Sequence, residues 1–180
     1  LNKPNLENVS FAYKLSTILK IKKNIILKAL DSFKGLPHRN ETFYYKNGIK
    51  FINDSKATSF EAAQHSLKYN KNIFWIVGGL PKLGDKFKLQ NVKKNIIKAY
   101  LIGKNINYFK RQIKGVLEQK SSFTIENALQ DIIKDLLLLR LKKATILLSP
   151  AGASYDQFKN FIQRGDNFKK LTFKYARKFL

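Results

Sequence analysis

Apolar and polar residues follow two different periods along the chain. Apolar positions recur at helical spacing over residues 6–19 and again over 23–34, which predicts two helices. A Gly-Leu-Pro sequence at 35–37 ends this helical opening. After it, short apolar runs bounded by turn residues alternate with segments of helical spacing, as expected where strands alternate with helices. We therefore expect a boundary near residues 35–40.

The second part of the chain predicts a hairpin followed by strand and helix units. Residues 42–45 and 49–52 predict extended segments, and the Lys-Asn-Gly sequence between them contains the Asn-Gly hairpin signal. Almost uniformly apolar runs such as NIFWIV predict strands that are buried on both faces of a sheet. The further strands are expected over 72–77, 99–102 and 145–148, and the helices over 59–69, 89–98, 106–115, 125–141 and about 155–178.

This alternation predicts the fold class. Strands and helices at such spacing form βαβ units, whose strands are parallel. We expect an α/β fold, with a Rossmann-like, mostly parallel sheet and helices on both faces, over residues 37–180. Residues 1–36 would be a short helical remnant of another domain. Because residue 1 is Leu and the sequence contains no Met, we expect the chain to be a piece of a longer polypeptide.

The composition excludes several classes of protein. Hydrophobic residues make up 44% of the 180 residues, which is enough for a core and excludes a disordered tail. Apolar runs are only a few residues long, whereas a membrane span needs about 18. The absence of cysteine excludes disulfides and thiolate metal sites, so a reducing cytoplasm is the expected location. His38 and His65 are the only imidazoles, which argues against a zinc enzyme.

The net charge is +23, from 35 basic and 12 acidic residues, and only five of the basic residues are Arg. Proteins that recognise bases and phosphates through planar, bidentate contacts usually use Arg for them. We therefore interpret the many lysines as a solvated surface. We expect no specific nucleic-acid partner, no membrane partner and a monomer. A basic Rossmann-like module that binds RNA is the alternative. Its stacking residues would come from Tyr44, Tyr45, Tyr69, Tyr108 and Phe109.

Polar or glycine-rich loops follow four of the predicted strands, at 53–58, 78–82, 103–104 and 149–154. In parallel sheets, ligands bind beyond the carboxyl ends of the strands. Lys56, Lys82 and two helix N-termini would share this edge and would favour a small dicarboxylate or a phosphate.

Each of these signals also has a purely structural explanation. Thr58 with Glu61 and Ser154 with Gln157 fit the capping-box pattern at the start of a helix. Gly79 would then only allow a turn.

Four further polar residues are candidates for nucleotide contacts. Asp54 could hold a ribose hydroxyl or Mg²⁺, or could pair with Lys56. Arg39 could stabilise phosphate charge or could be an exposed surface residue. Asn5 and Asn8 could reach a base or cap the first helix.

Several segments in sequence order resemble the Mur ligase family, and within it the branch that adds D-glutamate. They are GLPHRNE (35–41), INDSKAT (52–58), the Gly pair at 78–79, LSPAGASYDQF (148–158), Phe161 and RGD (164–166). Residues 4–9 look like the family's H-N-x-x-N segment, with Pro4 in place of the His. The resemblance covers nearly the whole chain. It implies that 1–36 end a central ATP-binding domain and that 37–180 form the C-terminal domain.

The resemblance also implies a reaction and a set of site residues. Relatives of this kind use ATP and Mg²⁺ to join D-glutamate to UDP-N-acetylmuramoyl-L-alanine through an acyl phosphate, in peptidoglycan precursor synthesis. The implied ATP contacts are Asn5, Asn8, Arg39 and Asp54. The implied D-glutamate contacts are Lys56, Thr58, Lys82, Ser154 and Phe161, with Lys56 also neutralising charge at the reacting centre. The magnesium ligands would lie upstream, so this chain alone would be inactive.

Two departures from the family pattern leave these contacts in place. Gly152 stands where the family usually has Cys, and the loop 79–82 lacks the common Gly-Lys pair but keeps its Lys. The D-N-P-R motif of the diaminopimelate- and lysine-adding relatives is absent. Its absence argues against those relatives and favours D-glutamate. A Mur-type ligase for a different amino acid is a further alternative.

Overall fold

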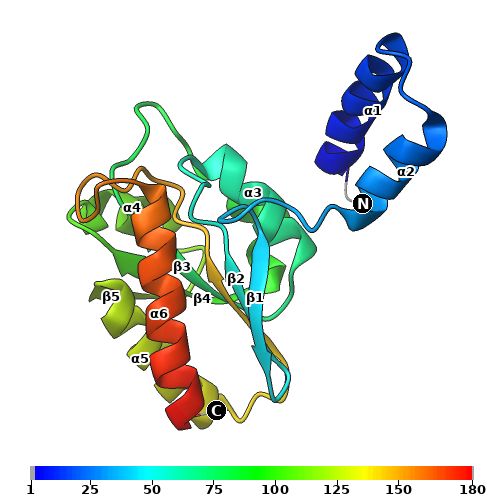
Figure 1. Cartoon of the computed structure of the whole chain (residues 1–180). Helices are drawn as coiled ribbons and strands as arrows, with labels where there is room; N and C mark the ends of the chain where they lie inside the picture. The colour runs from blue at the N-terminus through cyan, green and yellow to red at the C-terminus, as the bar shows by residue number, and fades with distance from the viewer. Residues whose placement is uncertain (1–2, 180) are drawn as a thin grey trace. The chain divides into compact units, whose positions relative to one another are not determined.

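A computed structural model describes residues 3–179 of the chain, which divide into two compact units at the boundary between Gly35 and Leu36 (Figure 1). The first unit consists of α1 (Lys3–Ile18) and α2 (Lys23–Ser32), which confirms the two expected helices. Large apolar side chains of this unit are exposed, including Phe11 and Ile18. No helix within the described part of the chain is both long and apolar enough to cross a membrane.

The second unit is built on a six-stranded sheet with the order β1-β2-β6-β3-β4-β5. All neighbouring strands are parallel except β1, which forms an antiparallel hairpin with β2, so the expected α/β fold is confirmed. Asn53 and Ile76 both pair with Leu148, and the strands β2, β3 and β6 therefore end close together. The strands are β1 (Glu41–Lys46), β2 (Ile49–Asn53), β3 (Ile73–Gly78), β4 (Ile96–Ile102), β5 (Gln119–Phe123) and β6 (Ala144–Leu148).

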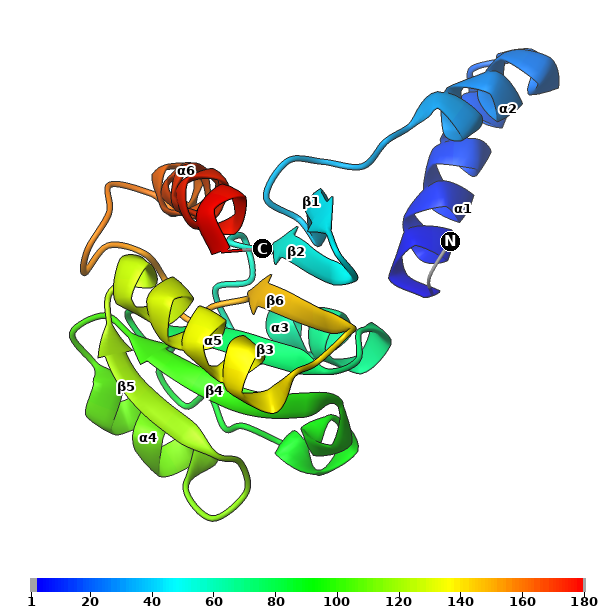
Figure 2. The same cartoon turned by 90° about the horizontal axis from the view of Figure 1, so that it is seen from below.

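Helices cover both faces of the sheet (Figure 2). On one face, α3 (Phe60–Tyr69) and α4 (Ile106–Ile113) pack against Trp75 and Val77 of the central strand. On the other face, α5 (Ile125–Leu139) and α6 (Phe161–Phe179) pack against Phe74 and Ile76. All four strand residues are fully buried, which explains why this strand is wholly apolar.

The expected helix over 89–98 is wrong. The segment forms two short 3₁₀ turns, and then β4 begins at residue 96. Leu89, Val92 and Asn95 are buried at intervals of three residues, which is the period of a 3₁₀-helix. The side-chain amide of Asn95 donates a hydrogen bond to the Leu67 carbonyl at 2.9 Å and anchors the segment to α3. The turns are Leu89–Asn91 and Lys93–Asn95.

The last helix begins later than expected, at Phe161 rather than near 155. The Ser154 carbonyl accepts hydrogen bonds from the amides of Gln157 and Phe158, so the chain turns here without starting a regular helix. The side chain of Asn160 accepts a hydrogen bond from the Gln163 amide at 2.8 Å, at the point where α6 starts. The expected capping box of Ser154 and Gln157 is therefore wrong.

The capping box expected at Thr58 is also wrong. Ser59 is the N-cap of α3, and its side chain accepts a hydrogen bond from the Ala62 amide at 3.3 Å. A second acceptor is the Asp85 carboxylate, which binds the Phe60 amide at 2.7 Å. These two residues, and not Thr58, therefore cap the helix. The side chain of Thr58 is exposed.

An ion pair and a hydrogen bond between β4 and α5 make stability depend on pH. Burial alone would raise the pKa of Asp135, but the Tyr100 hydroxyl at 2.6 Å and the Lys98 ammonium at 2.9 Å lower it overall. A carboxyl whose pKa is lowered by folding adds stability above its ordinary value of 3.8. This stability is lost as the pH falls through the folded-state pKa.

We therefore expect Asp135→Asn to lower the free energy of unfolding by about 1.5 kcal/mol at neutral pH. The difference from the unsubstituted chain should shrink as the pH falls below about 4. Urea unfolding followed by the fluorescence of buried Trp75 measures it, with exposed Asp31→Asn as the control. A difference that stayed constant down to acidic pH would contradict this account of Asp135.

Candidate functional site

Three loops meet beyond the carboxyl ends of β2, β3 and β6. The Ala151 amide donates to the Ala57 carbonyl at 2.9 Å, which joins the loops after β6 and β2. Leu80 and Ala153 form an isolated bridge with two reciprocal hydrogen bonds of 2.8 Å, which joins the loops after β3 and β6. A Cβ on Gly79 would lie 2.3 Å from the Ala153 carbonyl oxygen, so this close approach requires glycine.

The joined loops surround an open groove of about 410 Å³. Its lining residues include a hydroxyl from Thr58 and an ammonium from Lys82, and both side chains are exposed. Ser154 follows a lining residue directly and is itself buried. A cation and hydroxyls beside a small groove suit an anionic ligand. The lining residues are Thr58, Ser59, Leu80, Pro81, Lys82 and Ala153.

Lys56 and Phe161 contact each other beside this region. The Lys56 ammonium lies 4.1 Å from the centroid of the Phe161 ring, within cation–π distance, and both residues are half-buried. The Lys56 amide donates to the His38 carbonyl at 3.0 Å. The Phe161 ring and this hydrogen bond hold Lys56 in place on the loop after β2. Lys56 does not line the groove itself.

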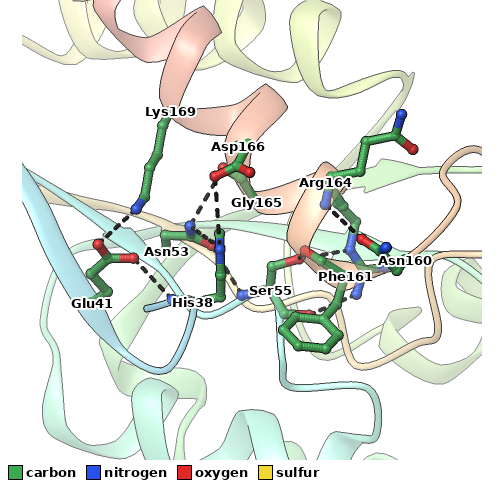
Figure 3. A network of polar contacts seen from close by, with 11 residues as sticks. His38, Glu41, Asn53, Ser55, Asn160, Phe161, Arg164, Gly165, Asp166 and Lys169 are labelled. Atoms are coloured by element: carbon green, nitrogen blue, oxygen red, sulfur yellow. Dashed lines mark hydrogen bonds and ion pairs between the residues drawn. The ribbon is translucent and has the colours of Figure 1, made fainter. Parts of the chain in front are cut away.

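A buried guanidinium ties the loops together (Figure 3). Arg164 is 1% exposed and donates to the Ser55 hydroxyl at 3.0 Å, the Ser55 carbonyl at 2.8 Å and the Gly152 carbonyl at 3.0 Å. The Ser55 hydroxyl donates in turn to the Phe161 carbonyl at 2.8 Å. Burial lowers the pKa of Arg164 to about 10, while the charge of Asp156 raises it. Arg164 therefore orders the loops that present Lys56, Ser154 and Phe161.

The turn before β1 is held in an unusual backbone conformation. His38 and Asn40 both have left-handed φ angles, of 62° and 46°. The buried His38 ring forms a 2.9 Å hydrogen bond with the Asn53 side chain, and its amide donates to Glu41 at 2.9 Å. Arg39 lies between the two left-handed residues and is exposed. A rigid turn thus presents this guanidinium to solvent.

The predicted nucleotide ligand Asp54 is buried and engaged within the chain. Its carboxylate accepts the Asn40 amide at 3.0 Å, the Ser66 hydroxyl at 2.6 Å and the Ser149 hydroxyl at 2.8 Å. Burial raises the pKa of Asp54 above its ordinary value, and these hydrogen bonds oppose the rise. These three hydrogen bonds, rather than the alternative pairing with Lys56, hold the Asp54 carboxylate. Asp54 instead braces the turn that presents Arg39.

The two Asn candidates belong to the first unit. Asn8 is exposed on α1, and the side chain of Asn5 lies outside the part of the chain that the structure describes. Among the described side chains, no group of three or more His, Asp or Glu residues could hold a metal ion.

Sequence reasoning missed Arg164, Ser55 and His38 as parts of the site. One signal was available for Arg164. The buried face of α6 comprises residues 164, 168, 172 and 176, so an Arg stands at the first position of an otherwise core-facing stripe. A charged residue at such a position requires buried hydrogen-bond partners.

The aromatic residues of the RNA-binding alternative do not form one surface. Phe109 is fully buried, and Tyr44 and Tyr108 pack against the two core clusters. Tyr45 and Tyr69 are 66% and 51% exposed, and they belong to β1 and α3. The arrangement lacks the row of exposed rings on which successive bases stack.

Comparison with known proteins shows relatives along nearly the whole chain. The chain is 39% identical over 168 residues to a UDP-N-acetylmuramoylalanine--D-glutamate ligase of Rhodospirillum rubrum. This match covers 93% of the chain and 35% of the relative. Proteins of the same name from Rickettsia felis and Roseobacter denitrificans are 36% and 37% identical over 93% and 95% of the chain, and 37% and 36% of their own lengths. No family model matches. The chain thus spans about a third of the length of the curated relatives it matches.

Proposed function

We propose that this chain, a homologue of the UDP-N-acetylmuramoylalanine--D-glutamate ligases over 93% of its length, supplies the D-glutamate-binding part of such a ligase. The observation that supports this most directly is the groove at the carboxyl edge of the sheet. It brings Thr58 and Lys82 together next to Ser154. These are three of the five residues that sequence reasoning assigned to D-glutamate. Residues 1–36 are proposed to end the ATP-binding domain.

The charges around the groove suit an acidic amino acid. Lys82 offers a point charge to one carboxylate, and the hydroxyl of Thr58 offers a hydrogen bond. Lys56, held against Phe161, lies on the same loop as Thr58 and would neutralise negative charge that develops as the amide forms. Ser154 and the backbone near it would donate to the second carboxylate. The chain's own residues thereby orient the substrate amine.

ATP would supply the activation of the acyl group, and this chain would contribute only part of its binding site. Arg39 is exposed on its braced turn and is the proposed phosphate contact. Asp54 would act by holding Asn40, and Asn5 and Asn8 would contact the nucleotide from the first unit. UDP-N-acetylmuramoyl-L-alanine and Mg²⁺ would be held by the rest of the longer protein. The chain by itself is proposed to bind D-glutamate without catalysing ligation.

Lys82→Ala should weaken D-glutamate binding to the chain by about tenfold to a hundredfold, because a hydrogen bond between charged groups is lost. Titration calorimetry or NMR shifts with D-glutamate measure the loss. Lys86→Ala is the matched control, since it removes an exposed lysine of the same loop that does not line the groove.

Two outcomes would contradict the proposal. One is equal affinity for D- and L-glutamate, which would indicate a non-specific anion site. The other is an equal loss of affinity in the Lys82 and Lys86 variants, which would indicate an effect of net charge alone.

A further inference from the structure

Three adjacent leucines are exposed at the C-terminal end of α5. Leu137, Leu138 and Leu139 are 59%, 79% and 49% exposed, while Leu136 before them is buried in the core. Single exposed leucines are ordinary on protein surfaces, but three of them exposed together at one helix end suggest an interaction site. The fold does not use these three side chains, because α5 packs on the sheet through its other apolar residues.

The leucines are surrounded by positive charge. Four exposed cations flank them, and the sequence contains no acidic residue between Asp135 and Asp156. The Ala144 amide, just after the α5–β6 connection, donates to the Gly48 carbonyl at 3.3 Å, so the tip of the β1–β2 hairpin lies at this end of the unit too. The Lys46 ammonium of that hairpin donates to the Ala176 carbonyl at 3.4 Å, which brings the end of α6 beside it. We call Leu137–Leu139 with Lys134, Arg140, Lys142 and Lys143 the α5-end surface.

We propose that the α5-end surface docks on an anionic lipid surface. Consecutive helical residues point about 100° apart, so three adjacent leucines fan over about 200° around the helix end. A single flat protein face would not bury all three, whereas a fluid bilayer can surround a protruding tip. Cations beside apolar side chains are the combination that binds peripheral proteins to anionic membranes. A second copy of the chain would instead bring like charges together.

The position of the surface is compatible with the groove. A short connection joins the end of α5 to the start of β6, so the α5-end surface lies at the amino-terminal edge of the sheet (Figure 1). The groove lies beyond the carboxyl ends of the strands. Lipid contact would therefore leave the groove open to solvent. The inference does not depend on the proposed ligase function, and it departs from the expectation of no membrane partner.

The chain has no cysteine, so single-cysteine labelling can test the docking. Leu138→Cys, labelled with an environment-sensitive dye, should show a blue shift on phosphatidylcholine vesicles that contain about a third phosphatidylglycerol, at about 0.15 M salt. Brominated lipids should quench the dye. Leu83→Cys is the matched control, because Leu83 is fully exposed and lies in the loop after β3, at the groove edge. The label there should not respond.

Paired substitutions separate docking from general attraction by the net charge. Leu137→Gln with Leu138→Gln should lower partitioning onto the same vesicles at least about tenfold. Lys142→Gln with Lys143→Gln should lower it about tenfold or more, and Lys86→Gln with Lys88→Gln should change it much less. Trp75 fluorescence during urea unfolding checks that each variant is folded.

Three results would overturn the proposal. Equal losses from the two lysine pairs would show adsorption by net charge alone. A response of the labels at both 138 and 83, or at neither, would show that the α5-end surface is not the contact. A blue shift at 138 with polyglutamate but not with vesicles would assign the surface to an acidic protein partner instead.

Discussion

Replacing Arg164 by methionine is expected to lower the free energy of unfolding by about 3–5 kcal/mol. Methionine fills most of the volume of the aliphatic stem, but the hydroxyl and carbonyl of Ser55 and the carbonyl of Gly152 would lose their donor. Each unsatisfied buried polar group costs about 1–3 kcal/mol. Burial lowers the pKa of the Arg164 guanidinium to about 10, so burying this charge has a cost. Methionine does not carry that cost, which offsets part of the expected loss of stability.

Urea unfolding measures the effect, with Arg177→Met as the control on the exposed face of the same helix. That control should change stability by less than about 0.5 kcal/mol. Arg164→Lys should fall between the two, because an ammonium lacks the planar fork that reaches Ser55 and Gly152 together. If the two methionine variants were equally stable, the buried hydrogen bonds of Arg164 would contribute nothing.

Gly165→Ala is expected to destabilise the chain by about 2–3 kcal/mol, although alanine favours a helix more than glycine does. A Cβ at this position would lie 2.3 Å from Nδ1 of His38 and 2.9 Å from the side-chain nitrogen of Asn53. Both side chains are buried and hydrogen-bonded to each other at 2.9 Å, so neither can move cheaply. The clash therefore outweighs the gain of up to about 1 kcal/mol in helix propensity.

A double-mutant cycle tests this explanation. In a His38→Ala background the nearest clashing atom is gone, so the added cost of Gly165→Ala should fall by at least about 1 kcal/mol. Lys170→Ala, on the exposed side of α6, is the control and should be close to neutral. Additive effects of the His38 and Gly165 substitutions would contradict the assignment of the clash.

The sequence predicted the elements that are defined by their own apolar pattern. The strands β3 and β6 are buried and apolar apart from Thr145, and the amphipathic helix α5 ends within two residues of its expected end. The edge strand β5 was missed because its sequence, QKSSF, is polar and its backbone pairs with β4 alone. Such a strand is determined by its neighbour in the sheet, which no local pattern reveals.

The candidate site was predictable in its chemistry but not in its contacts. Lys82 and Thr58 follow strand ends, and strand ends of a parallel sheet share one edge. Arg164 binds Ser55, a residue 109 positions away in the sequence, and only the folded sheet brings the two together. Asp54 shows a second limit, because an acidic residue after a strand suggested a ligand, and the sequence did not reveal its internal hydrogen bonds to Ser66 and Ser149.

The two reciprocal hydrogen bonds between Leu80 and Ala153 have a dynamic consequence. The loop that presents Lys82 and the loop that presents Ser154 cannot open independently, since movement of either must first break the bridge. Amide protons of both residues should then exchange with solvent at the same rate. A guest molecule would engage both loops together or neither, so its capture would be a single cooperative event.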